Sequence, residues 1–571
     1  MRHILNVITV NNNLFERNKN KYNKSFGSSQ LVSSAFMAVN KHEILGVSAI
    51  DLISMVIPRS IIDFTRNKEA GTETVIRESS STATHAAIGV SGFGAAALLS
   101  QGLKHKNYGV DFKAVTANDD TVNAMAKLFK IVVDENKDAD KNALRLKFLE
   151  KVYENVEGLG GNSDDLAKTG NKLWFKLGSE NKNKIIGKII SQMDSSKSFK
   201  LPSALSNQLE GYMNIDIPST QNLKVNLAGK EVFTKGAHFV SDSYSLTKSF
   251  LQDNVLKIFK NTKDIDSNTF IQDLKNLSVR KTTLGLAAIC AVALSMQAFN
   301  RHLTKKRTGK GGFVGDPNYD KKVEDPKIPK KNDAMFIPLK LLSVVTMGFF
   351  IFKTVNASSF KDFLSKVQFK GVLPTVNQIK VVYGSTILGR LIAASDKNEL
   401  RESAFRDFLG YTNFLVLGAL VTKWFVNMKD KSLINYDSNL HGKGWWNWLK
   451  NSSVKTHEEV INSTLKENVV KDSGIVPLKE LYKNDWIKPN GEIAKKLGVL
   501  NKAKLIGMLY ACIALGIIVP LINKHMTQRK NKTQIQQENL ANDTASKTSF
   551  DMENIEKTQK IINNFLNKKS A

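Results

Sequence analysis

The chain has 571 residues, with 82 Lys and Arg against 53 Asp and Glu, 42% hydrophobic residues, nine His and two Cys. Its length allows about three to four domain-sized units with sizeable cores. The hydrophobic content excludes a wholly disordered chain, and the few cysteines and histidines exclude a disulfide framework and a protein of many zinc sites.

The net charge of +29 has three explanations: a nucleic-acid partner, an anionic membrane surface, or the codon usage of an AT-rich genome. Lys far outnumbers Arg and Asn is abundant, as codon usage alone would give. The chain has no basic stripe interleaved with aromatic residues and no zinc-finger or RNP-type spacing, which argues against nucleic acid. Dense basic clusters instead follow apolar runs, so we expect the anionic headgroups of membrane lipids to be the partner.

After a polar N-terminus of residues 1–43, expected to be loosely ordered, long apolar runs recur along the chain. A bilayer-spanning helix needs about 20 mostly apolar residues. Two runs meet this well and three come close: 282–300 and 505–523, then 82–103, 408–428 and 341–352, the last within a candidate span at 335–353. We therefore expect an all-α, mainly helical, polytopic membrane protein. The alternative is a large soluble helical protein in which these helices are buried.

Basic clusters end the two most apolar runs without an intervening acid. The first comprises Arg301, His302, Lys305, Lys306 and Arg307, and the second comprises Lys524, His525, Arg529 and Lys530. Positive residues beside a span normally mark the cytoplasmic side of a membrane. We name these clusters the basic tails and expect them at the cytoplasmic face of a cell membrane.

Two parts of the chain match each other in the same order. Asn300–Thr304 aligns with Asn523–Thr527, residues 54–67 align with 385–398, and Glu73–Glu78 aligns with Glu402–Asp407 after a gap of two residues. We interpret this as internal duplication, each half being a helical hairpin with a domain inserted between its spans. The first half is 44–307 with insertion 104–281, the linker is 308–372, the second half is 373–530 with insertion 429–504, and the tail is 531–571.

The first insertion is predicted to be a mainly helical soluble domain. Apolar residues recur at helical spacing over 122–133, 144–156 and 185–193, with the segment Asn118-Asp119-Asp120 as a candidate cap before the first stretch and Gly158 ending the second. Alternation around Ala228-Gly229 predicts a hairpin over 223–233. This insertion and the tail, with a short amphipathic helix at 550–566, are the candidate surfaces for protein partners.

The second insertion contains the sequence WWNW at Trp445–Trp448. Tryptophan is enriched where membrane proteins meet the bilayer interface, so the segment is a candidate aromatic anchor. Tryptophans are equally common in protein cores, so the sequence is compatible with both an interfacial anchor and a buried core segment.

Arginine is concentrated in the two matching segments, in a chain that otherwise uses Lys. Arginine's planar fork suits bidentate contacts with carboxylate or phosphate. One interpretation is a structural clasp in which Arg59 and Arg390 each face an acid of their own half, with i,i+4 bracing by Glu73–Arg77 and Glu402–Arg406. The other is recognition of an anion, either a lipid headgroup or a solute. The candidate residues are Arg59, Glu73, Arg77, Glu78, Arg390, Glu402, Arg406 and Asp407.

No catalytic constellation, cofactor motif or metal-ligand spacing stands out, which argues against an enzyme. The leading expectation is a non-enzymatic membrane scaffold or envelope-organising protein, with the motif segments and basic tails cytoplasmic and the insertions outside. The alternative is a transporter or lipid-handling protein with an anion-binding site between the halves. Parallel and inverted halves both remain possible from the sequence, because the number of crossings between them is open.

Overall fold

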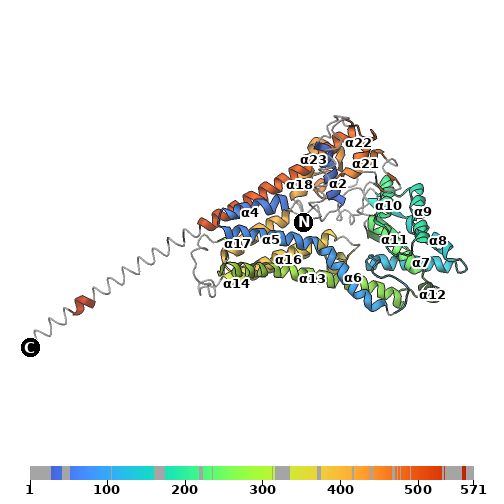
Figure 1. Cartoon of the computed structure of the whole chain (residues 1–571), viewed down its shortest axis with the longest axis horizontal. Coiled ribbons are helices and arrows are strands. Elements are labelled where there is room, and N and C mark those ends of the chain that lie inside the picture. The colour runs from blue at the N-terminus through green and yellow to red at the C-terminus, as the bar shows by residue number, and fades with distance from the viewer. Residues whose placement is uncertain are drawn as a thin grey trace, which may run out of the picture.

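The computed structural model is mostly helical, in agreement with the predicted class, and Figure 1 shows its arrangement. The structure describes residues 28–41, 52–104, 106–159, 174–217, 223–234, 236–310, 313–315, 335–369, 374–413, 417–436, 442–465, 470–471, 474–475, 478–488, 490–529, 533, 536 and 556–560. Of the predicted tail helix at 550–566, only 556–560 lies within these residues, and it is helical.

Helices of the two halves form an elongated bundle whose wider end carries the insertions (Figure 1). The first half contributes η1 (Leu52–Val56), α4 (Ile57–Phe64), α5 (Lys68–Ala86), α6 (Ile88–Lys104) and α13 (Thr269–Thr308). The linker contributes α14 (Phe336–Thr354) and α15 (Phe360–Lys366). The second half contributes α16 (Val376–Ala393), α17 (Lys397–Thr412), α18 (Gly418–Lys429), α23 (Glu492–Ala511) and η7 (Cys512–Ile518).

Side-chain caps start α5 and α17 after short turns. Asn67 accepts a hydrogen bond from the Ala70 amide at 2.7 Å, and Asp396 accepts one from the Glu399 amide at 2.9 Å. Such caps satisfy amides that have no partner within the helix. The caps correct the sequence alignment, which pairs Asn67 with Asn398: the gap of two residues falls in the turn, before the cap.

Helices of each half pack against helices of the other half. α13 packs against α5 and α6 of its own half and also along α16 of the second half, while η7 packs against η1 and α4 of the first half. Glycines permit the closest approaches. A Cβ on Gly389 of α16 would lie 2.4 Å from the Leu294 carbonyl oxygen of α13. The backbones of α13 and α16 are therefore in near contact, as in tightly packed membrane helices.

Three helices of the described part are long and apolar enough to span a membrane: α13, α14 and the continuous helix Glu492–Arg529 that includes α23 and η7. A fourth candidate is the pair α5 and α6, which is bent by 47°. The predicted run 408–428 is divided between α17 and α18, and residues 414–416 lie outside the described part.

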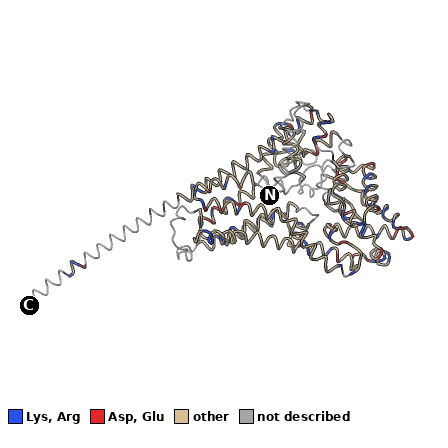
Figure 2. Tube along the Cα trace, in the orientation of Figure 1, with Lys and Arg blue, Asp and Glu red and all other residues tan. Residues whose placement is uncertain are grey.

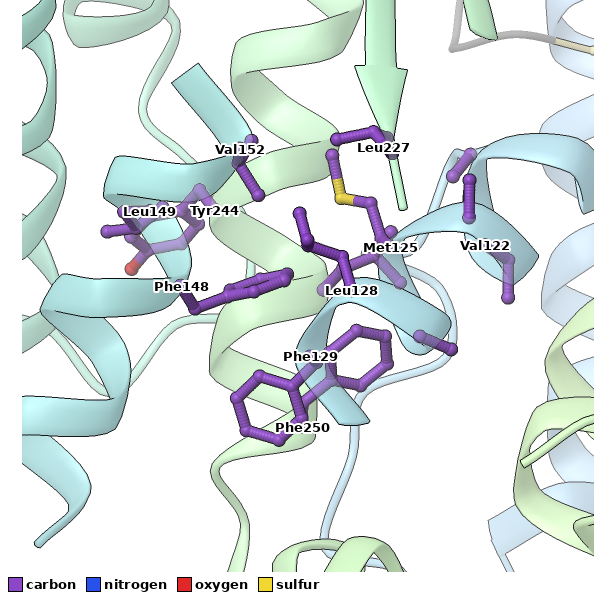
Figure 3. Packing of buried hydrophobic residues seen from close by; sticks show 14 of the residues in the cluster. Val122, Met125, Leu128, Phe129, Phe148, Leu149, Val152, Leu227, Tyr244 and Phe250 are labelled. Atoms are coloured by element: carbon purple, nitrogen blue, oxygen red, sulfur yellow. The ribbon is translucent and has the colours of Figure 1, made fainter. Parts of the chain in front are cut away.

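The first insertion combines helices with a four-stranded antiparallel sheet of order β2-β1-β3-β4. Its helices are α7 (Asp119–Glu135), α8 (Lys141–Glu154), α9 (Ser179–Ser195), α10 (Ser203–Asp216), α11 (Gly236–Phe250) and α12 (Asp253–Asn261), and its strands are β1 (Val156–Leu159), β2 (Trp174–Lys176), β3 (Leu223–Leu227) and β4 (Lys230–Thr234). Figure 3 shows part of its core, where Phe129 of α7, Phe148 of α8 and Phe250 of α11 meet.

The sheet contains the predicted hairpin, and it also shows that the predicted role of Gly158 is wrong. The predicted hairpin is present, and Ala228 and Gly229 make its turn with φ of 51° and 79°. Gly158 does not end the preceding helix, because α8 stops at Glu154 and Gly158 lies in β1. A Cβ there would lie 1.9 Å from the Ile217 side chain, so this glycine allows close packing in the sheet rather than a helix end.

The second insertion is smaller and is joined by a helix from the N-terminus. It comprises η5 (Lys431–Leu433), α20 (Trp445–Asn451), α21 (His457–Leu465), α22 (Leu478–Lys483) and the short strands β5 (Ile434–Asn435), β6 (Ser453–Val454), β7 (Val470–Lys471) and β8 (Gly474–Ile475). Helix α2 (Ser28–Lys41) packs on α21, α22 and α23, with Phe36 buried. The expectation of a loosely ordered N-terminus is therefore wrong for 28–41, because Phe36 supplies an apolar contact there.

The outer surfaces of the bundle and of the first insertion differ in polarity. Bundle helices expose many large apolar side chains, such as Val90 of α6, 72% exposed, and Phe349 of α14, 61% exposed. Within the described part of the first insertion, the only exposed large hydrophobic side chains are Ile131 and Leu146, at 39% and 42%. Figure 2 shows long stretches of the bundle helices without charged residues, whereas charged residues recur at short intervals along the first insertion. An apolar exterior of this extent is unusual for a surface in water.

Candidate functional site: the arginine network between the halves

Six buried charged residues from both halves meet inside the bundle, and we name them the arginine network. They are Arg59 of α4, Arg77 and Glu78 of α5, Arg390 of α16, and Arg406 and Asp407 of α17. All six are among the arginines and acids singled out in the sequence. Four guanidinium groups share two carboxylates within the network, and a third acid, Asp63, is linked to Arg77 through the Thr74 hydroxyl.

Arg390 lies at the centre of the network and joins the halves. Its Nη1 donates to Asp407 Oδ1 at 2.9 Å within the second half, and its Nη2 donates to Glu78 Oε2 at 3.1 Å in the first half. The sequence predicts a bidentate fork on one carboxylate. The structure instead divides the guanidinium between two carboxylates, because α5 and α17 both pack against α16.

Arg59, which the sequence alignment pairs with Arg390, contacts its acid with looser geometry. Its Nη1 lies 3.7 Å from Glu78 Oε2, and its Nε donates to the Leu515 carbonyl oxygen of η7 at 3.1 Å. The acid of its own half is therefore the same Glu78 oxygen that Arg390 contacts. Arg59 also links the first half to η7 of the second half, so both arginines make contacts across the halves.

Arg77 and Arg406 contact the acid next to them in sequence. Arg77 Nε donates to Glu78 Oε1 at 3.3 Å and Arg406 Nε donates to Asp407 Oδ1 at 2.9 Å. The predicted i,i+4 braces are not formed. In a buried setting, hydrogen bonds that fix a shared carboxylate matter more than exposed helix pairs.

The acids predicted to brace those arginines have other partners, which match between the halves. Glu73 accepts a hydrogen bond from Thr304 Oγ1 at 3.1 Å, and Glu402 accepts one from Thr527 Oγ1. The two threonines occupy the same position in the matching segments at the ends of α13 and of the helix that continues η7. Glu73 also accepts from Gln297 Nε2 at 3.3 Å.

A further layer lies at the turns before α5 and α17. Arg66 Nη1 lies 3.0 Å from Glu402 Oε2 in the other half, and its Nε lies 3.1 Å from Asp63 Oδ1. Arg401 Nη2 donates to Thr527 Oγ1 at 2.7 Å. Arg66 is thus a second residue whose charge is paired across the halves.

Two residues of the basic tails bind the turn of the opposite half. Arg301 donates to the Ala393 carbonyl oxygen and to Glu399, and Lys524 Nζ donates to Thr65 Oγ1 at 2.8 Å. Arg307 instead contacts Glu69 of its own half at 3.0 Å. His302, Lys305, Lys306, His525 and Arg529 are exposed, and Lys530 lies outside the described residues.

Some buried polar atoms near the network lack a hydrogen-bond partner among the residues that the structure describes. These include Arg59 Nη2, Arg390 Nε and His85 Nε2. The His85 ring lies edge-on to Tyr383 with centroids 5.2 Å apart, and a Cβ on Gly410 would lie 2.9 Å from Tyr383 Oη and 3.9 Å from Arg59 Nη2. Arg59 of the first half and Arg390 of the second, both of which contact Glu78, thus each keep a nitrogen without a hydrogen-bond partner in the described part of the chain.

No group of His, Cys, Asp or Glu with the geometry of a metal site occurs within the described ranges. Both cysteines are free and half-buried.

Sequence reasoning missed several members of the surrounding layers, namely Asp63, His85, Gln297 and Glu399. Asp63 has a local signal, its i,i+3 spacing to Arg66. Thr304 and Thr527 have a signal in the matching segments, although their hydroxyls were not assigned a role. Gln297 and His85 have none, because their partners lie on helices far away in sequence.

The chain gives no match to any protein-family model, to any curated protein or to any solved structure in these three comparisons.

Proposed function

We propose that the chain is a multi-pass membrane scaffold, built from two homologous halves that interlock inside the bilayer and hold both insertions on one side. The observation that carries this proposal is that the helix bundle has an apolar exterior and a charged interior. Bundle helices turn large apolar side chains outward and enclose the arginine network. Charges inside an apolar-surfaced bundle are expected to pair with each other, as these do.

Homology of the halves is supported by matching contacts. Thr304–Glu73 and Thr527–Glu402 are the same pair in two copies, as are Arg59–Glu78 and Arg390–Asp407. Each half also places its first helix against the last helix of the other half. This reciprocal exchange is what a duplicated unit with an approximate two-fold axis would give.

A common orientation of the halves is supported by the basic tails. Arg301 contacts the turn that precedes α17, and Lys524 contacts the turn that precedes α5, so both tails and both turns gather at one end of the bundle. At the other end, α10 of the first insertion packs against α21, β7 and β8 of the second. By the positive-inside rule, the tails are cytoplasmic and the insertions are outside.

A scaffold role, rather than transport, is favoured by how firmly the first insertion is attached. α13 runs without a break from the insertion core, where Phe270 and Leu274 are buried, to the basic tail. At its junction with the insertion, Lys281 Nζ donates to the Thr116 carbonyl oxygen at 3.0 Å. A continuous helix of this kind holds the insertion in a fixed position relative to the bundle, which suits a domain that presents its surface to other proteins.

Membrane association is tested by alkaline-carbonate extraction of native membranes. We expect the chain to remain in the pellet, and release into the supernatant would contradict the proposal. Scaffolding is tested by a photo-crosslinking amino acid at the insertion residue Lys147 in native membranes, with Phe349 as the control site. We expect a discrete protein adduct at Lys147 and none at Phe349. The absence of protein adducts at Lys147 and at other exposed positions of the insertion would contradict a scaffold.

A second candidate function, anion handling between the halves, is favoured by the unpaired buried donors. Arg59 Nη2 and Arg390 Nε of the arginine network, and His85 Nε2 near it, have no hydrogen-bond partner in the described part of the chain. Thermal unfolding of the detergent-purified chain in chloride, nitrate and phosphate salts of equal ionic strength tests this. A stabilisation by one anion that Arg59→Lys abolishes supports the candidate, and identical curves in all salts count against it.

A further inference from the structure

Three tryptophans are strongly exposed near the C-terminal end of α18, where the second insertion begins. Trp424 of α18 is 61% exposed, and Trp445 and Trp446 of α20 are 57% and 66% exposed. Tryptophan carries one of the largest apolar surfaces of any side chain, and leaving it in water forgoes much of the benefit of burial. A group of exposed tryptophans therefore indicates a surface that something else covers.

The orientation of these side chains is fixed by local structure. Lys423 Nζ donates to the Leu449 carbonyl oxygen at 2.9 Å, which holds α20 against α18. Gly442 and Gly444 have φ of 79° and 127°, a region that glycine adopts readily, and they turn the chain into α20. The Trp445 and Trp446 rings contact each other edge-on, with centroids 4.7 Å apart.

The chemistry around the tryptophans matches a lipid interface. Met428, on the last turn of α18, is also exposed and extends the apolar surface. Lys429, Lys431 and Lys443 are exposed beside it. Indole rings and lysines side by side are typical of segments that lie in the headgroup region of an anionic bilayer, where the ring is half in hydrocarbon and its N–H reaches water.

The position of the group in the fold also favours lipid over a protein partner. Lys423, the residue before Trp424, bonds to the Leu449 carbonyl oxygen of α20, so the exposed tryptophans lie on adjoining helices. Phe425 and Val426, the residues after Trp424, are buried in the core of the second insertion. The tryptophans therefore lie where the apolar-surfaced bundle meets the insertion, which is the level at which interfacial aromatic residues are expected.

We propose that Trp445 and Trp446 insert, together with Trp424, into the headgroup region of the outer leaflet and fix the second insertion to the membrane surface. This inference rests on the membrane location proposed above. It assigns α20 as an interfacial helix whose partner is the bilayer itself.

Depth-dependent fluorescence quenching tests the inference on the full chain in vesicles of phosphatidylcholine and phosphatidylglycerol. The vesicles contain lipids brominated either near the headgroup end or near the terminus of the acyl chains. We expect stronger quenching by the shallow bromines, and W445F/W446F should remove about half of it or more, because these rings would lie at that depth. W486F is the matched control, because this ring packs against the core of the second insertion, and it should leave the quenching unchanged.

The outcomes separate this inference from the membrane proposal. If W424F lowers the quenching but W445F/W446F does not, the chain is in the bilayer and α20 is not at the interface, which overturns the inference. If a second copy of the chain or another protein covers Trp445 and Trp446, W445F/W446F will likewise leave the quenching unchanged, and the inference is overturned. If no variant changes the quenching and the chain is extracted by carbonate, the membrane proposal itself fails.

Discussion

Arg390 of α16 donates through Nη2 to Glu78 Oε2 of α5 at 3.1 Å, across 312 residues of sequence. The same carboxylate oxygen lies 3.7 Å from Arg59 Nη1. One acid therefore serves the arginine of each half. Removing either half would leave charges buried without partners, a state that costs several kcal/mol. The network thus makes the two halves depend on each other for stability.

Arg390→Lys is predicted to lower the free energy of unfolding by about 1–3 kcal/mol, because an ammonium cannot reach Glu78 and Asp407 in the fixed geometry of the guanidinium. Arg59→Lys should cost less, since its contact with Glu78 is longer. Denaturant unfolding in detergent measures both, with the exposed Arg529→Lys as a neutral control. Equal losses for all three variants would show that the network contributes no specific stability.

The threonine pairs give a prediction about the equivalence of the halves. Thr304→Val removes one hydrogen bond to a buried carboxylate, and Thr527→Val removes the corresponding bond together with the one that Thr527 accepts from Arg401. Each should destabilise the protein by about 1–3 kcal/mol, with the larger loss for Thr527→Val. Thr283→Val is the control, because its exposed hydroxyl bonds only a carbonyl of its own helix. A loss at one position and none at the other would mean that the two contacts are not equivalent.

Close approach of α13 and α16 gives a prediction for Gly389. Gly389→Ala would place Cβ 2.4 Å from a backbone oxygen of α13 and force the helices apart, at a cost of about 1–3 kcal/mol or more. Gly348→Ala in α14 is the control, because its Cβ would meet nothing within 4 Å. The melting temperatures of the two variants in detergent check this, and an unchanged value for Gly389→Ala would argue against the helix contact.

The sequence predicted local features well because they depend on neighbouring residues. The helical stretch at 122–133 follows from apolar spacing, its start follows from the segment Asn118-Asp119-Asp120, and the hairpin follows from the Ala228-Gly229 turn. The placement of arginine in a Lys-rich chain singled out the residues of the arginine network, but it did not predict that they are buried.

Partners across the halves could not be derived in the same way. Arg59 and Arg390 were each expected to face an acid of their own half, and the contact of Glu78 with Arg390 arises only because α5 and α16 pack together in three dimensions. Gly158 was misread for a related reason. A glycine after an apolar helix commonly ends it, and only the neighbouring Ile217 side chain shows that the glycine is needed inside a sheet.

The first insertion has a buried acid that should make its stability depend on pH. Burial raises the pKa of Asp242 to about 7, although the Thr116 hydroxyl and the Lys281 ammonium lower it. The folded protein therefore keeps a proton that the unfolded chain releases near pH 4. For this group, stability falls as the pH rises from about 4 to about 7, by up to about 1.4 kcal/mol per unit, and does not change further above that range.

Asp242→Asn should remove this decline, because the amide has no charge to release. Urea unfolding followed by fluorescence between about pH 5 and pH 8 measures the slope, with the exposed Asp138→Asn as the control. An Asp242→Asn slope equal to that of the parent protein would show that Asp242 is not protonated in the folded state near neutral pH.

The central claim, two interlocked halves of the same orientation in one membrane, is tested most directly by cysteine accessibility. With Cys290 and Cys512 replaced by Ala, single cysteines are placed at Lys305 and Arg529 in the two basic tails and at Lys182 and Lys443 in the two insertions. A membrane-impermeant maleimide applied to intact cells is predicted to label both insertion sites, and to label both tail sites only after permeabilisation. Labelling of one tail site from outside and the other from inside would show inverted halves and contradict the account.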